Sequence, residues 1–261
     1  MTINVGRAPY GGTQTRLCRV CQSRRSVIAG QRGFARRCAK LRGMFYLIGV
    51  NHNAQRFSPG SKLDGDQTKL EWCLSKAIKD CHPKLIAVEE NEDTLVDKRT
   101  GVVDESIPRN IAQRHGIEPI LLEPSDHDKT RLGYKCNSEI HAQLFTSGLL
   151  RDCPPSLQTA AVDAVEVALV FPLRELFWIE KLKKYLESEV IVVLGENHID
   201  SFSRRLQELG VPSKVLCRGI GVTAAQMCEI EATKRFPADN PNLFEAMIKG
   251  MRERDLRLKG C

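Results

Sequence analysis

Short apolar runs, separated by stretches with helical periodicity, restrict what this chain can fold into. The runs are Met44–Val50, Lys84–Val88, Ile117–Leu122, Glu189–Leu194 and Ser213–Cys217. The first and fourth carry apolar residues at successive positions, which is typical of strands covered on both faces. Strands that alternate with helices favour an α/β fold. We therefore predict a largely parallel central sheet flanked by helices.

The segments between the runs predict the helices around this sheet. The expected single helices cover residues 66–81, Asp104–His115, Leu173–Leu186 and 198–209. Apolar residues recur in them at helical spacing. The stretch before the fourth strand is too long for a simple crossover, and we expect a helical insertion there over about 137–172, broken at Pro154-Pro155 and Pro172. C-terminal helices are expected over about 223–258, with a break at Pro237 and Pro241.

Charge divides the chain into a basic tail and a slightly acidic domain. Residues 1–43 hold ten Lys and Arg and no Asp or Glu, whereas the other 218 residues hold 29 basic and 32 acidic side chains. We interpret 1–43 as a disordered extension. A transit peptide, a nucleic-acid-binding arm and half of a zinc site at Cys18 and Cys21 are the alternatives. Residues 44–261 form one α/β domain, for which a nucleic-acid partner is not expected.

The dispersed cysteines and the absence of long apolar runs indicate a protein of the cytoplasm. No run approaches the ~18 apolar residues needed to cross a bilayer, so no membrane partner is expected. Cys73, Cys81, Cys217 and Cys228 fall within predicted helices or strands, where a thiol behaves as a small hydrophobe. Without a secretory signal before them, we expect the ten cysteines to be free thiols in a reducing compartment.

The same short motif follows two of the predicted strands. The first strand ends in Gly49-Val50-Asn51-His52, and the fourth ends in Gly195-Glu196-Asn197-His198. The carboxyl ends of parallel strands lie at one edge of a sheet, where ligands bind. We therefore expect His52 and His198 to face one crevice. A single histidine after a strand is more often a capping or packing residue, but the repeated context favours a shared site.

Other strand ends and one helix supply further candidates. Glu89 and Glu90 follow the second strand, and a carboxylate directly after a buried run needs a partner or a metal. Arg174 opens a predicted helix, where it is either the bidentate partner of a carboxylate or an exposed residue. Residues expected to contact a substrate are Asn51, Asn197, Glu196, Glu175 and His127.

Together these motifs resemble the TraB/Tiki-like and erythromycin-esterase-like superfamily over about residues 44–217. The resemblance rests on two G-x-x-H motifs at strand ends, acidic residues after the second strand and an Arg-Glu-bearing helix before the second motif. It matches His52 and His198 to the motif histidines, Glu89 or Glu90 to the acidic position, and Arg174 to a helix arginine. It implies a mixed α/β core with both motifs in one cleft.

The resemblance also implies hydrolysis, in one of two forms. The Tiki-like branch implies divalent-metal-dependent proteolysis, the esterase branch implies metal-independent hydrolysis in which a histidine activates water, and a further branch binds haem iron. Asn precedes each motif histidine here, a departure that argues against Tiki-like proteolysis.

Two classes of function follow. The first is a hydrolase in which His52 or His198, oriented by Glu89 or Glu90, deprotonates water, while Arg174, Asn51 or Asn197 holds the oxyanion of a small-molecule or peptide-like substrate. In a variant of it, His52, His198 and Glu89 bind a divalent metal that activates the water. The second is a non-catalytic binding or sensor domain that keeps the cleft for a small ligand.

Overall fold

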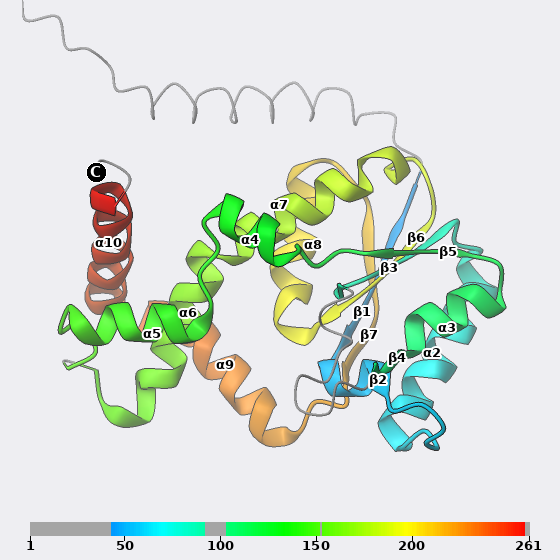
Figure 1. Ribbon diagram of the computed structural model, residues 1–261, viewed down its shortest axis with the longest axis horizontal. Coiled ribbons are helices and arrows are strands. Elements are labelled where there is room, and N and C mark those ends of the chain that lie inside the picture. The colour runs from blue at the N-terminus through cyan, green and yellow to red at the C-terminus, as the bar shows by residue number, and fades with distance from the viewer. Residues whose placement is uncertain (1–42, 92–102, 152, 259–261) are drawn as a thin grey trace, which may run out of the picture. The chain divides into compact units, whose positions relative to one another are not determined.

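A parallel sheet forms the centre of the computed structural model, which describes residues 43–91, 103–151 and 153–258 (Figure 1). Its strand order is β5-β3-β6-β1-β7. The bounds are Phe45–Val50 for β1, Leu85–Val88 for β3, Glu118–Leu121 for β5, Val190–Gly195 for β6 and Ser213–Ile220 for β7. All neighbouring pairs in this sheet run parallel. The predicted α/β fold with a largely parallel sheet is confirmed.

Helices cover both faces of the sheet, which explains the continuous apolar runs. α2 (Gly65–Cys81) and α3 (Ile107–Arg114) lie on one side, and α7 (Phe171–Leu182) and α8 (Ile199–Glu208) lie on the other (Figure 1). Every residue of β6 is buried. A strand of this kind has no solvent-facing side that polar residues could occupy.

Local chemistry sets where the helices begin, and it shifts some predicted bounds. Asp64 and Gln67 form a capping box that starts α2. The helix expected from Asp104 begins later, because Glu105–Ser106 (β4) pairs antiparallel with Arg56–Phe57 (β2). The break expected at Pro172 is present, because a 41° bend at Val170 separates Gln158–Leu169 (α6) from α7, and Pro172 lies in the first turn of α7, a position that suits proline. α4 (Asp126–Leu132) was not expected.

The predicted insertion and the C-terminal helices form one helical layer. It consists of α5 (Asn137–Thr146), α6 (Gln158–Leu169), α9 (Ala224–Asp239) and α10 (Pro241–Leu258). Ile140, Val165, Phe236 and Met247 share its apolar core. The helical insertion is confirmed, but its pairing with α9 and α10 was not predicted. Pro237 lies inside α9, so the break falls at Pro241 alone.

A disulfide joins Cys73 of α2 to Cys217 of β7. The prediction of free thiols is wrong for this pair, because α2 packs beside an edge strand that follows it by 144 residues in sequence. Cys81, Cys136, Cys153 and Cys228 are free. The predictions for the tail, including the half zinc site, fall outside the described residues. The cytoplasmic location was inferred partly from the expected free thiols. Nothing in the structure tests it, and it stays a prediction.

No single helix in the described ranges has both the length and the apolar character required to cross a membrane. Segments Pro155–Leu169 and Phe171–Tyr185 meet that test only when they are counted together across a 41° bend.

Candidate functional site

The two copies of the G-x-N-H motif lie side by side at one edge of the sheet. β1 and β6 are adjacent and parallel, with Val50 opposite Gly195. Each strand continues into a single 3-10 turn, which spans His52–Gln55 after β1 and Glu196–His198 after β6. The expectation that these strands run parallel in one sheet, with both histidines at the same edge, is confirmed.

The glycine of each motif makes room for a side chain of the other. A Cβ atom on Gly49 would lie 2.1 Å from Oε2 of Glu196, and a Cβ atom on Gly195 would lie 3.0 Å from Nε2 of His52. Close approach of a neighbouring group is one of the conditions that require glycine. The repeat is therefore explained by contact between the two copies.

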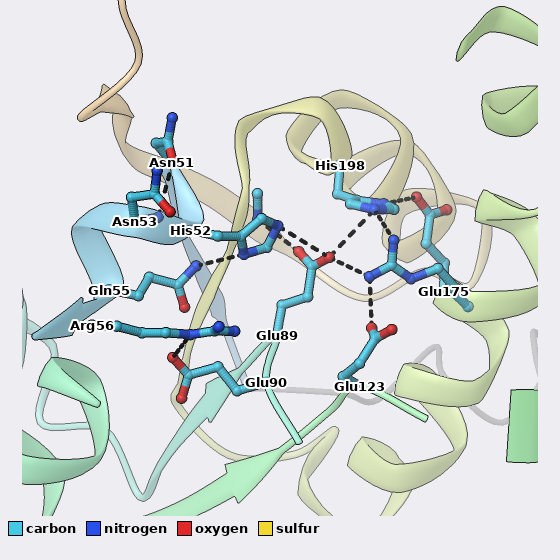
Figure 2. A network of polar contacts seen from close by, with 12 residues as sticks. Asn51, His52, Asn53, Gln55, Arg56, Glu89, Glu90, Glu123, Glu175 and His198 are labelled. Atoms are coloured by element: carbon cyan, nitrogen blue, oxygen red, sulfur yellow. Dashed lines mark hydrogen bonds and ion pairs between the residues drawn. The ribbon is translucent and has the colours of Figure 1, made fainter. Parts of the chain in front are cut away.

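Glu89 lies at the centre of the site, between the two histidines (Figure 2). Its Oε2 accepts a hydrogen bond from the Gly195 N–H at 2.7 Å, and its Oε1 accepts one from Nη2 of Arg174 at 2.5 Å. Nε2 of His198 lies 3.5 Å from Oε1, and Nε2 of His52 lies 3.8 Å from it. Burial alone would raise the pKa of Glu89, but His198, Arg174, His52 and the Gly195 N–H together lower it to about 2. Glu89 is therefore an ionised carboxylate at neutral pH.

Arg174 links the carboxylates to His198. Its Nη2 donates to Glu89 and, at 2.6 Å, to Oε2 of Glu123. Its Nη1 lies 3.1 Å from Nε2 of His198, and its guanidinium packs over the ring of Trp178. Burial opposes the charge of Arg174, but the two carboxylates raise its pKa above the ordinary value. Of the two alternatives for Arg174, the structure shows the carboxylate partner.

Glu123 was missed by the sequence analysis. It follows the third strand as Glu89 follows the second, and its backbone N–H donates to the carbonyl of Glu90. The available signal was this shared position after an apolar run, which was used for Glu89 alone.

His198 is buried and held on all sides. Its ring stacks on Phe171 with centroids 3.6 Å apart, and its Nδ1 lies 3.3 Å from Oε1 of Glu175. A guanidinium can only donate, so Nε2 of His198 accepts from Arg174, and in the neutral ring Nδ1–H donates to Glu175. Glu175 is completely buried behind His198 and also binds Arg205. Glu175 therefore orients His198. This role does not fit the substrate contact that we expected for Glu175.

His52 occupies a different environment, at the surface of a cavity. Its side chain is 47% exposed, and its Nδ1 lies 3.2 Å from Nε2 of Gln55. The cavity has a volume of about 350 Å³. The sheet edge contributes His52, Glu89, Asn197 and His198 to its lining, and α7 contributes Arg174. The two histidines therefore share one site, but only His52 presents much of its ring to solvent.

The remaining motif residues line the same cavity, but they differ in whether their side chains are already engaged in hydrogen bonds. The Asn51 side chain accepts from the Asn53 N–H and donates to Gln226, so both ends of its amide are engaged. Glu196 is buried and accepts from the Gly219 N–H at 2.8 Å. Asn197 is exposed at the cavity surface. Of the three, Asn197 is the one whose amide is available to a ligand.

Besides Glu175, two predicted residues do not join the cavity. Glu90 points away from His198, with its Oε1 3.6 Å from Nε of Arg56, and burial raises its pKa (Figure 2). Glu89 is therefore the acidic residue of the site. His127 is exposed on α4 and is not among the cavity residues, so the substrate contact expected for it is not supported.

The donor set does not fit a metal ion. Oε1 of Glu89 and Nε2 of His198 are the groups that a metal would use, and both are bound to the guanidinium of Arg174. A divalent cation there would displace or face a fixed positive charge. Within the described ranges, no group of three or more His, Cys, Asp or Glu side chains is arranged to hold a metal. The metal set of His52, His198 and Glu89 is thus not supported.

Carboxylates from the helical layer complete the cavity and were also missed. Asp163 and Glu166 of α6 and Glu229 of α9 face the sheet edge across it. Burial raises the pKa of Glu166 to about 7, with Arg174 opposing the rise and Asp163 adding to it. No local pattern marks these residues, because their approach to the histidines depends on how the helical layer packs.

Comparisons with family models, with curated proteins and with solved structures found no match for this chain.

Proposed function

We propose that this protein is a hydrolase in which His52 activates a water molecule for attack on a carbonyl carbon. The observation that carries the proposal is a solvent-accessible imidazole, at the surface of a cavity, beside a buried and ionised carboxylate. A neutral imidazole suits proton abstraction near neutral pH. Glu89 would stabilise the imidazolium that forms, because its negative charge lies 3.8 Å from Nε2.

Arg174 and His198 position Glu89 in this proposal. The donors of Arg174 toward the cluster are engaged by Glu89, Glu123 and His198, so the arginine does not hold the oxyanion. The exposed amide of Asn197 is the donor assigned to that charge. The resemblance to the superfamily's metal-independent esterase branch agrees with this assignment. For a hydrolase of that type, we propose a small carbonyl compound as the substrate.

The orientation of Gln55 decides whether His52 is ready to act as a base. To accept a proton at Nε2, the neutral ring must carry its proton at Nδ1, and Gln55 must then present its amide oxygen. A half-turn of the Gln55 amide, whose two ends have the same shape, provides this acceptor. We therefore include Gln55 among the positioning residues.

The contact between Gln55 and His52 also favours a second candidate function, a non-catalytic site for a small ligand. With the Gln55 NH₂ group toward Nδ1, the neutral His52 ring carries its proton at Nε2. His52 is then a hydrogen-bond donor in the cavity and has no free lone pair for water. A sensor or binding domain needs only that arrangement.

Hydrolysis of p-nitrophenyl esters by the full chain tests the proposal. We expect His52→Ala to lower kcat/KM by about 10²–10⁴-fold, the usual contribution of a general base. His127→Ala is the matched control, because His127 is exposed and outside the cavity. Activity should survive a metal chelator, since the donor set does not fit a metal.

Two results would contradict the proposal. One is a His52→Ala variant as active as the wild type, and the other is a wild type that hydrolyses no ester yet binds a small ligand at the cavity. The double variant with His198→Ala should lose little beyond the single variant, since groups that act as a unit are non-additive. Melting curves of each variant separate loss of chemistry from loss of fold.

A further inference from the structure

Ester hydrolysis needs a proton donor for the leaving group as well as a base for water, and at the sheet edge His52 alone could supply that proton. Glu89 is ionised, and the pKa of Arg174 lies above the ordinary value for an arginine. Nε2 of His198 accepts from Arg174 and carries no proton in the neutral ring. The imidazolium that His52 forms with the proton from water is therefore the one donor at the sheet edge, and it would have to serve both proton transfers. A second titratable group on another wall of the cavity would separate the two roles.

Glu166 is placed on that other wall. It belongs to α6, in the helical layer, and lines the same cavity as His52 and Asn197. Its neighbour Asp163, one turn earlier, is engaged in a hydrogen bond from Nδ2 of Asn137 at 2.7 Å. Among the described residues, the Glu166 carboxyl has no such hydrogen bond. It is thus free to meet a substrate that enters between α6 and the sheet edge.

We propose that Glu166 is the general acid of this cavity, and that it donates a proton to the leaving-group oxygen of an alkyl ester. This inference rests on the proposed hydrolase function. His52 takes one proton from water, and the water oxygen bonds to the carbonyl carbon. When the tetrahedral intermediate collapses, the carbon–oxygen bond breaks and its electron pair goes to the leaving oxygen, which receives the Glu166 proton. His52 then releases its proton to solvent and Glu166 takes one up from solvent, so water and ester become acid and alcohol.

The charges around Glu166 support this role. A general acid works best when its pKa lies near the operating pH, and burial, with Asp163 adding to it, raises the pKa of Glu166 to about 7. The titratable or charged groups that face it are Asp163 on α6, Arg174 on α7, Glu229 on α9, Tyr134, and Glu89 and Glu123 at the strand ends. Arg174 is the single cation in this set, and it is engaged by two carboxylates.

Esters with two kinds of leaving group test the proposal. We expect Glu166→Gln to lower kcat/KM for an ethyl ester by about 10²–10⁴-fold, because ethoxide leaves only with a proton. The same variant should change kcat/KM for the matching p-nitrophenyl ester by less than about threefold, because nitrophenolate leaves unprotonated. The fall of ethyl-ester activity at high pH in the wild type should disappear in the variant.

Glu180→Gln is the matched control, since it makes the same change at a surface glutamate that does not line the cavity. It should keep the wild-type ratio of ethyl-ester to p-nitrophenyl-ester activity. Equal losses on both esters in Glu166→Gln, or no loss on either, would overturn the role of Glu166 while leaving the hydrolase proposal intact. Loss of both activities in His52→Ala tests the hydrolase proposal separately.

A titration without substrate gives an independent test. Carbon-13 NMR of the side-chain carboxyls should show one signal with a midpoint near 7, absent from Glu166→Gln. A midpoint below about 5, close to that of an ordinary glutamate, would overturn the proposal even if the protein hydrolyses esters.

Discussion

Replacing Arg174 with methionine should destabilise the protein strongly at neutral pH. Arg174 is 12% exposed and neutralises two carboxylates, Glu89 at 1% and Glu123 at 8% exposure. Methionine keeps much of the side-chain volume but removes the charge and the hydrogen bonds. Both carboxylates would then remain buried without their cation, which is a costly arrangement in a protein interior.

Two estimates of the magnitude agree. Breaking a buried ion pair by removing one partner costs about 3–5 kcal/mol. A carboxyl whose pKa falls from 4.5 to about 2 on folding, as for Glu89, contributes about 3 kcal/mol, and Arg174 supplies part of it. Glu123 loses its cation as well. We expect a loss of about 3–5 kcal/mol, or about 10 °C in Tm at roughly 2–4 °C per kcal/mol.

Urea unfolding at several pH values is the assay, because the effect has a defined sign. The pKa of Glu89 is lower in the folded state, so its contribution is complete above about pH 4.5 and is lost as the pH falls toward about 2. The gap between wild type and Arg174→Met should therefore be largest near neutral pH and narrow as the solution is acidified.

Arg114→Met is the matched control for this experiment. Arg114 pairs with Glu71 on the surface and is 60% exposed, so its loss should cost about 0–1 kcal/mol. A similarly small cost for Arg174→Met, or a cost that does not change with pH, would refute the argument that Arg174 holds a buried ionic network.

Three further predictions concern packing, titration and covalent linkage. Gly49→Ala should cost about 1–3 kcal/mol in urea unfolding, because its Cβ would meet Oε2 of Glu196 at 2.1 Å. Adding Glu196→Ala should recover part of that loss. Glu166→Gln should raise Tm at about pH 8 but not at about pH 5, because the raised pKa of Glu166 makes the wild type lose about 1–3 kcal/mol as the pH rises through about 7. Equal shifts at both pH values would contradict this. Cys217→Ser should cost about 2–4 kcal/mol by removing the link to Cys73, and reduced wild type should then match the variant.

The sequence alone determined the fold class and the edge of the sheet at which the site lies. Apolar runs such as Met44–Val50 require cover on both faces, and helices between the runs supply it. Parallel strands then place their carboxyl ends together. His52, His198 and Glu89 could be assembled from these two rules, because each lies within a few residues after the end of a strand.

Only the tertiary structure decided what each of those side chains does. The motif copies have the same sequence pattern, yet His198 is buried against Phe171 while His52 faces the cavity. The difference comes from α7, which packs over one copy and not over the other. Nothing within the motif itself distinguishes the two histidines.

The sequence also did not reveal which residues from distant parts of the chain contact one another. Arg174 meets Glu123 across 51 residues, and Cys73 meets Cys217 across 144. Glu166 reaches the cavity only because the helical layer packs there. Periodicity and spacing report on neighbours within a turn or a strand, whereas these contacts depend on how whole elements pack, and that packing is set by the sum of many weak apolar contacts.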